Sequence, residues 1–143
     1  MGATQAGVVE RVVDGDTLIV RIDGERQRIR AIGIDSPELT DDDPLVRDLA
    51  EAAADELASL VDGREVLLER DVSETDRFGR LLRYVWVDDA RGSLDLVNLR
   101  MVATGYARVV TFPPDVAWHP TLLAAEDAAR DADLGLWALD PGG

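Results

Sequence analysis

VVERVVDGDTLIVRIDGERQRIRAIGI, residues 8–34, contains three strand-like runs separated by two turn signals. The turn signals are Asp14-Gly15 and Asp23-Gly24, dipeptides that close tight β-hairpins between alternating apolar runs. The predicted strands are residues 8–13, 17–22 and 27–34. Three consecutive strands joined by tight turns form an antiparallel meander, so the first quarter of the chain predicts a mainly β core.

A helix is predicted after the third strand. Pro44 stands where a helix begins, and Asp62-Gly63 ends the pattern with a glycine that suits a left-handed cap. Between them apolar residues recur at helical spacing, which predicts one face packed against the core. The apolar stripe consists of Leu45, Leu49, Ala53, Leu57 and either Leu60 or Val61.

The rest of the chain predicts further strands at 65–69 and 83–87, a short β segment at 106–110, and two more helices. Ser93 caps the second helix, which ends near Thr104, and Pro120 opens the third. The third helix faces inward through Leu122, Leu123, Ala125, Ala129 and Ala132. This order of elements fits an α+β fold with a mainly β core, a five-stranded OB-type Greek-key barrel with three helices. We expect residues 1–143 to form one domain with an ordered core of about 8–137 and a frayed end from Asp140 to Gly143.

The charge balance is strongly acidic. The formal net charge is −14, all fifteen basic residues are arginine, and there is no lysine. Such a surface repels polyanions at long range, but a bound cation and a few arginines can dominate the field at one site. Molar salt shortens the Debye length to about 3 Å and removes most of the distant repulsion. The composition is typical of a halophilic protein, and a GC-rich genome is the alternative explanation.

The chain has no cysteine, which excludes disulfides and thiolate metal sites and leaves the redox compartment open. It contains no run of about 18 apolar residues, so we expect no membrane span. Residues 1–30 contain no basic-then-apolar signal segment. We expect a monomer.

Three carboxylates of two short segments predict a metal site. Asp16 follows the first tight turn, and Asp35-Ser36-Pro37-Glu38 follows the third strand, so these groups reach one end of the meander. Ligand sets made only of oxygen favour a hard cation, calcium or magnesium. Asp14, beside Gly15, is better explained as a turn residue.

Two arginines near these carboxylates predict a phosphate site. Arg30 lies in the third strand, and Arg80 follows a turn in Asp76-Arg77-Phe78-Gly79-Arg80. The guanidinium group binds phosphate oxygens in a bidentate manner. Glu38 follows Pro37, which restricts the backbone before it. A position between metal and phosphate would let Glu38 act as a general base or position the attacking water. The combination is equipment for metal-assisted cleavage of phosphodiesters.

The two segments together resemble the signature motifs of the staphylococcal nuclease (thermonuclease) family. Asp14-Gly15-Asp16-Thr17, Arg30, Asp35-Ser36-Pro37-Glu38 and Asp76-Arg77-Phe78-Gly79-Arg80 match in order and spacing. Further landmarks are Val97-Asn98-Leu99, Gly105-Tyr106-Ala107 and Gly135-Leu136-Trp137. The resemblance covers roughly residues 8–137, and it implies an OB-type barrel with three helices.

The resemblance also implies an activity and a role for each site residue. The activity is Ca²⁺-dependent cleavage of DNA and RNA by in-line attack of water, which leaves 3′-phosphate ends. Asp16 and Asp35 would bind Ca²⁺ through their side chains, and Ser36 through its backbone carbonyl. Glu38 would orient the attacking water, and Arg30 and Arg80 would stabilise charge on the phosphoryl oxygens. Members of the family are commonly exported or envelope-attached, so we expect an extracellular or cell-envelope location on the resemblance alone.

The sequence departs from the family pattern where the nucleotide would bind. Phe78 replaces a tyrosine whose hydroxyl contacts phosphate, and Thr111 falls about where a tyrosine meets the base. Phe112 or Trp118 can stack on a base instead. We therefore expect Phe78, Thr111 and Phe112 to contact substrate, with single-stranded or denatured DNA and RNA preferred over rigid duplex. The alternatives are a non-catalytic OB-type module that binds single-stranded nucleic acid, and a purely structural, salt-tolerant domain.

Overall fold

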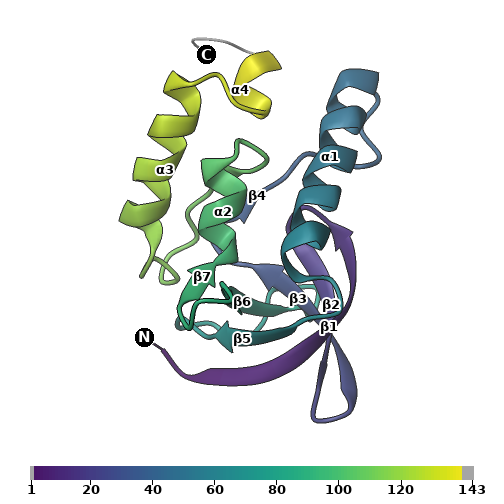
Figure 1. The fold of residues 1–143 in the computed structure, drawn as a ribbon, viewed down its shortest axis with the longest axis vertical. Coiled ribbons are helices and arrows are strands. Elements are labelled where there is room, and N and C mark those ends of the chain that lie inside the picture. Colours follow the sequence, from purple (N-terminus) through teal and green to yellow (C-terminus); the bar gives the residue numbers. More distant parts are fainter. Residues whose placement is uncertain (1, 140–143) are drawn as a thin grey trace.

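The computed structural model describes residues 2–139, which form a β-barrel with helices packed at one end (Figure 1). The strands are β1 (Thr4–Asp14), β2 (Thr17–Ile22), β3 (Glu25–Ala31), β4 (Ile34–Asp35), β5 (Glu65–Glu69), β6 (Leu81–Asp88), β7 (Leu94–Leu96) and β8 (Arg108–Val109). The helices are α1 (Pro44–Val61), α2 (Val97–Ala103), α3 (His119–Asp131) and α4 (Leu136–Leu139).

Five strands close the barrel in the order β3-β2-β1-β5-β6, and a parallel pairing of β3 with β6 completes the ring. The other pairings in the ring are antiparallel. Strand β1 pairs with β5 through its first half and with β2 through its second, and two irregularities in its register let it curve round the barrel. The predicted α+β fold with a five-stranded OB-type barrel is confirmed.

The core is made by the inward faces of the strands and by one face of α1 and α2. Strand β2 contributes Leu18, Val20 and Ile22, which alternate along the strand as its pattern predicts. Helix α1 begins at Pro44 and ends before Asp62, as expected, but its buried face is displaced by one position at its start. Leu45 is 61% exposed, and the buried residues of the helix are Ala50, Ala53, Leu57 and Val61.

The third strand is shorter than predicted, because a turn at Ile32-Gly33 separates β3 from β4. The Ile32 amide donates to the Arg83 carbonyl of β6, and Gly33 takes a φ of +79°. A side chain at Gly33 would also come within 2.8 Å of Leu122. The chain then pairs with β8 instead of continuing β3, so Asp35 ends a separate short strand.

The predicted second helix is wrong at its start. Residues 94–96 form β7, an edge strand paired with β6, and α2 begins only at Val97 after Leu96. Ser93 lies in the turn before β7, where its amide donates to Asp89. Pairing with β6 satisfies the backbone of 94–96 and so removes these residues from the helix.

Residues 2–139 contain four helices, where three were predicted, and the additional helix lies in the C-terminal part. The fourth, α4, follows a close contact in which the Leu136 amide donates to the Gly105 carbonyl. Helix α3 buries Leu122 and Ala129 but leaves Leu123 and Ala132 exposed. The predicted fraying of Asp140–Gly143 lies outside the described residues. Within the described part of the chain, no helix is both long and apolar enough to cross a bilayer.

Candidate active site

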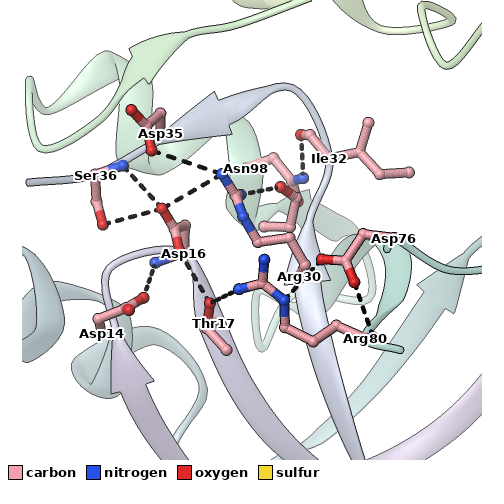
Figure 2. Close-up of polar contacts among 11 residues, drawn as sticks. Asp14, Asp16, Thr17, Arg30, Ile32, Asp35, Ser36, Asp76, Arg80 and Asn98 are labelled. Atoms are coloured by element: carbon pink, nitrogen blue, oxygen red, sulfur yellow. Dashed lines mark hydrogen bonds and ion pairs between the residues drawn. The ribbon is translucent and has the colours of Figure 1, made fainter. Parts of the chain in front are cut away.

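Asp16 is held by the turn between β1 and β2 and by the segment after β4 (Figure 2). Its amide donates to Asp14 Oδ1 at 3.0 Å, so Asp14 acts as the turn residue that the sequence predicts. Its Oδ2 accepts from the Ser36 amide at 3.0 Å and from the Ser36 hydroxyl at 3.3 Å. Oδ1 accepts from the Thr17 hydroxyl at 3.0 Å. Asp16 is only 7% exposed, and these donors satisfy a buried carboxylate.

Arg30 lies between two carboxylates. Its Nη2 is 3.6 Å from Asp16 Oδ2 and 3.7 Å from Asp35 Oδ1, and its Nη1 donates to the Ala31 carbonyl at 2.6 Å. The Arg30 side chain is 15% exposed, whereas that of Asp35 is 47% exposed. The guanidinium group is thus fixed by the protein while one neighbouring carboxylate remains open to solvent (Figure 2).

The carboxylates of this site carry more negative charge than Arg30 balances. Burial, together with the hydrogen bond and the charge of Asp16, raises the pKa of Asp14 to about 6. Burial also acts to raise the pKa of Asp16, but Arg30, Asp14, Ser36 and Thr17 outweigh burial and hold the pKa below its ordinary value. A carboxyl with a raised pKa beside an ionised one indicates a local excess of negative charge, which a cation would relieve.

The donor atoms fit a hard cation with few protein ligands. The side chains that converge are carboxylates and hydroxyls, and oxygen ligands suit Ca²⁺ or Mg²⁺. Within residues 2–139, no group of three or more His, Asp or Glu side chains is arranged to hold a metal ion. The site therefore offers two carboxylates, Asp16 and Asp35, on either side of Arg30, rather than a complete cage.

Glu38 lies on the loop after β4 and is exposed. It is near enough to contribute to the raised pKa of Asp14, but its side chain makes no hydrogen bond to another residue in the described part of the chain. The structure thus brings Asp16, Arg30 and Asp35 into contact and leaves Glu38 beside them, free to meet solvent.

Arg80 is aimed at the same site by Asp76, to which the sequence assigned no role of its own. Asp76 Oδ1 accepts from the amides of Phe78 and Arg80 at 2.9 and 3.0 Å, and its Oδ2 accepts from Arg80 Nε at 2.7 Å. Arg80 Nη1 then reaches the Thr17 hydroxyl at 3.4 Å. Thr17 thereby links Asp16 to Arg80 (Figure 2), and the two arginines reach the site from β3 and from the turn before β6.

A cleft of about 640 Å³ opens beside the two arginines. Phe78 and Phe112 are 61% and 68% exposed, and both line the cleft. The guanidinium of Arg77 lies 4.8 Å from the centre of the Phe78 ring, and that of Arg80 lies 5.5 Å from it. Exposed aromatic rings beside a phosphate site can stack with bases.

Thr111 and the alternative stacking residue Trp118 lie outside the cleft lining. Thr111 is exposed but is absent from the cleft lining, and its hydroxyl lies 3.1 Å from the His119 ring nitrogens. Trp118 packs edge-on to Trp86 with 5.3 Å between ring centres, and its indole donates to Glu69 at 3.1 Å. The Trp118 ring is therefore occupied by contacts within the protein. Phe112, which is exposed in the cleft, is better placed than Trp118 to stack on a base.

Asp115 lines the cleft and was not predicted from the sequence. It is 7% exposed, and its Oδ1 accepts from the amides of Val72 and Ser73 at 2.9 and 2.8 Å. These bonds tie the loop after β8 to the loop after β5. A Pro-Pro-Asp sequence signals only a turn, since partners 42 and 43 residues away are set by the fold.

Replacing Asp76 with Ala is expected to destabilise the protein at neutral pH. Burial acts to raise the pKa of Asp76, but the amides of Arg80 and Phe78 and the Arg80 guanidinium hold it below its ordinary value. A depressed pKa contributes stability that is present above the unfolded pKa of about 3.9 and is lost as pH falls through the folded pKa. We expect a loss of about 1.5–3 kcal/mol at pH 7, the range for hydrogen bonds to a charged group.

Urea unfolding of wild type and Asp76→Ala at neutral pH and below about pH 3 measures this contribution. The difference in free energy of unfolding should shrink at the lower pH, where the wild-type carboxyl is protonated. The same difference at both pH values would contradict a role for the ionised carboxylate.

The protein is a closed OB-type barrel in which Arg30 and Arg80 lie beside carboxylates and line a cleft with exposed aromatic rings. This combination is typical of one class of protein, the hydrolases of phosphodiester bonds. Comparison with known proteins agrees. A family model described as "Staphylococcal nuclease homologue" matches residues 28–139. The chain is 32% identical to a thermonuclease of Staphylococcus intermedius, over 91% of this chain and 74% of that protein.

Two further relatives cover almost the same part of the chain. Protein ParB of Escherichia coli is 37% identical over 94% of this chain and 73% of its own length. Endonuclease YncB of Bacillus subtilis is 29% identical over 91% of this chain and 60% of its own length. The chain belongs to the staphylococcal nuclease homologue family. It is accordingly a nuclease, a hydrolase that acts on phosphodiester bonds.

Proposed function

We propose that the chain is a Ca²⁺-dependent nuclease that hydrolyses DNA and RNA by in-line attack of water and leaves 3′-phosphate ends. The observation that carries the proposal is the position of Arg30, held between Asp16 and Asp35 on one side and facing the Arg80 cleft on the other. Arginines fixed beside carboxylates can neutralise a phosphate without reorganising during the reaction.

Asp16 and Asp35 would hold the ion through their carboxylates, with the Ser36 carbonyl as a further oxygen ligand. When bound, Ca²⁺ supplies positive charge to the phosphoryl oxygen and a place to orient water. The excess of negative charge around Asp14 and Asp16 supports a cation at this point. A site with few protein ligands should bind the ion weakly in the absence of substrate.

Arg30, Arg80 and Glu38 would bind the phosphate and orient the attacking water. Arg30 and Arg80 would bind the phosphoryl oxygens and stabilise the charge that develops on them as the 5′ oxygen leaves. Glu38, exposed and without a side-chain partner in residues 2–139, would accept a hydrogen bond from the attacking water and orient it in line with the leaving group. Asp76 and Thr17 keep Arg80 in place.

The cleft favours nucleic acid with unpaired bases. Phe78 and Phe112 expose their rings on its walls, and a base can stack on an exposed ring only when it is not buried in a duplex. Stacking on an aromatic side chain contributes about 1–3 kcal/mol per base. Because stacking does not depend on charge, it also suits a protein with a formal net charge of −14. Single-stranded or denatured DNA and RNA are thus the proposed substrates.

The chemistry of the ends produced tests the direction of bond cleavage. Digestion of a 5′-labelled oligonucleotide should give fragments that a 3′-phosphatase shifts in a gel and that a polymerase extends only after phosphatase treatment. Fragments that are extended at once would carry 3′-hydroxyl ends, and would contradict departure of the 5′ oxygen.

Molar sodium chloride is expected to stabilise the protein. The acidic groups repel one another, and an increase from about 0.1 M to 1 M salt shortens the Debye length from about 10 Å to about 3 Å. We expect the midpoint of thermal unfolding to rise by roughly 5 °C or more, about the effect of 1–2 kcal/mol for a chain of this size. An unchanged or lower midpoint would favour genomic codon bias over halophilic adaptation as the origin of the acidic, lysine-free composition.

A further inference from the structure

One face of the barrel gathers five arginines, four of which the proposed active site does not use. Alternate residues of a strand share a face, and Ile29 and Ala31 mark the inward face of β3 because both are buried. The outward face of β3 therefore carries Arg26, Arg28 and Arg30 at successive two-residue steps. Arg30 is the member that reaches the active site.

The neighbouring strands extend this row. Arg28 pairs with Ile19 of β2, which in turn pairs with Arg11 of β1, and Arg26 pairs with Arg21. Five of the fifteen arginines thus occupy one face of a three-stranded sheet. We call them the arginine ladder: Arg11, Arg21, Arg26, Arg28 and Arg30.

The ladder holds more arginines than the carboxylates that pair with it. Glu10 is the carboxylate that faces its middle, and it pairs with Arg26 at 2.6 Å and with Arg21 at 3.7 Å. Asp23 and Glu25 lie at the turn beyond its outer end. Arg11 and Arg28 are exposed, and neither forms an ion pair within 4.0 Å in residues 2–139. On a chain with a net charge of −14, two such guanidinium groups next to a phosphate site are an unexpected concentration of positive charge.

The arginine ladder is long enough to contact several nucleotides of a strand that leaves the active site. The β2–β3 hairpin projects from the barrel at the end away from the helices (Figure 1). A strand rises about 3.4 Å per residue, so Arg26 lies about 14 Å from Arg30 along β3. This distance corresponds to a few nucleotides of an extended strand, within the site size of about 4–16 nucleotides that OB-type folds cover.

We propose that the arginine ladder binds the sugar–phosphate backbone of the nucleic-acid strand that flanks the scissile bond, without reading its sequence. The inference rests on the proposed function, because it uses Arg30 as the point where the strand enters the site. Arg11 and Arg28 would supply two phosphate contacts, and Arg21 and Arg26 would remain tied to Glu10. The ladder would then guide long substrates and make no difference to short ones.

The test measures binding without catalysis. Arg11→Gln/Arg28→Gln is compared with Arg91→Gln/Arg100→Gln, an equal change of charge at exposed arginines outside the ladder. Fluorescence anisotropy of a labelled oligothymidylate, in excess chelator and over a series of salt concentrations, gives Kd. The ladder variant should bind on the order of tenfold more weakly at low salt, and its slope of log K against log salt should fall by about 1.4, since each phosphate contact on a single strand contributes about 0.7.

The control variant should keep the wild-type slope, and all three proteins should converge at molar salt. Equal affinities for the three proteins at low salt, including an absence of measurable binding, would overturn the ladder. Cleavage of a dinucleotide with Ca²⁺ tests the proposed function separately. A dinucleotide has one phosphodiester, which would lie at Arg30, so it has no flanking phosphate for the rest of the arginine ladder to bind. A protein that binds oligothymidylate through the ladder but cleaves no substrate would refute the nuclease activity and leave the ladder intact.

Discussion

Replacing Arg30 with Gln is expected to lower kcat by about 10²–10³, the loss seen when one donor to a developing oxyanion is removed. Arg30 is 15% exposed in its side chain and is held by Asp16 and Asp35, so it can meet the phosphate without searching for its position. A glutamine keeps much of the volume but loses the charge and the paired N–H groups. Activity on a short substrate with saturating Ca²⁺ is the measurement.

Two companion variants separate charge from position. Arg30→Lys keeps the charge without the planar fork, and should recover only part of the rate. Arg100→Gln removes an exposed arginine outside both the active site and the ladder, and should leave kcat unchanged. Circular dichroism and thermal unfolding establish that each variant is folded. A folded Arg30→Gln protein with near-wild-type kcat would remove Arg30 from the transition-state contacts.

Asp16→Asn should raise the Ca²⁺ concentration required for half-maximal activity by at least about 10- to 100-fold, which is what loss of an outer-shell partner alone costs a metal site. The amide oxygen of asparagine can still accept from the Ser36 amide and hydroxyl, which bond to one carboxylate oxygen, and its NH2 can donate to the Thr17 hydroxyl in place of the present bond, so the turn should survive. The anionic ligand is lost, and Arg30 loses one of its two counter-charges.

Asp43→Asn is the matched control, because Asp43 caps α1 by accepting from the Leu45 amide and an asparagine can do the same. It should leave the Ca²⁺ dependence unchanged. The same shift in both variants would mean that general surface charge, rather than a ligand at Asp16, sets the dependence on calcium.

The hairpins and the long helix were predictable because local chemistry determines them. Asp14-Gly15 and Asp23-Gly24 can close tight turns whatever surrounds them, and the alternation in 17–22 leaves one inward face. Pro44 and Gly63 likewise bound α1 by backbone geometry alone. Boundaries set by distant partners were not predictable in this way.

The break after Ala31 and the late start of α2 show why. The Ile32 amide bonds to β6, and Leu96 pairs with Trp86 of β6, so in each case pairing with that strand decides where an element begins or ends. Period and propensity within 27–34 or 93–104 carry no information on such partners.

The same distinction applies to the candidate site. The sequence motifs predicted that Asp16, Arg30 and Asp35 belong to one site, and the structure brings these three side chains together. The roles of Thr17 and Asp76 required the fold, because a threonine hydroxyl that links Asp16 to Arg80 spans 63 residues. Thr111 lies outside the cleft lining, and its hydroxyl is turned toward His119.

Cleavage of heat-denatured DNA by wild type and by Glu38→Gln, each with Ca²⁺ and with Ca²⁺ plus excess chelator, tests the central claim most directly. We expect the wild-type protein to cleave only with free Ca²⁺, and Glu38→Gln to be slower by about 10²–10⁴, the contribution of a positioned general base. Cleavage that persists in chelator, or a folded wild-type protein that cleaves nothing with Ca²⁺, would contradict a calcium-dependent nuclease. In the second case binding of single strands without cleavage would identify a non-catalytic OB-type module.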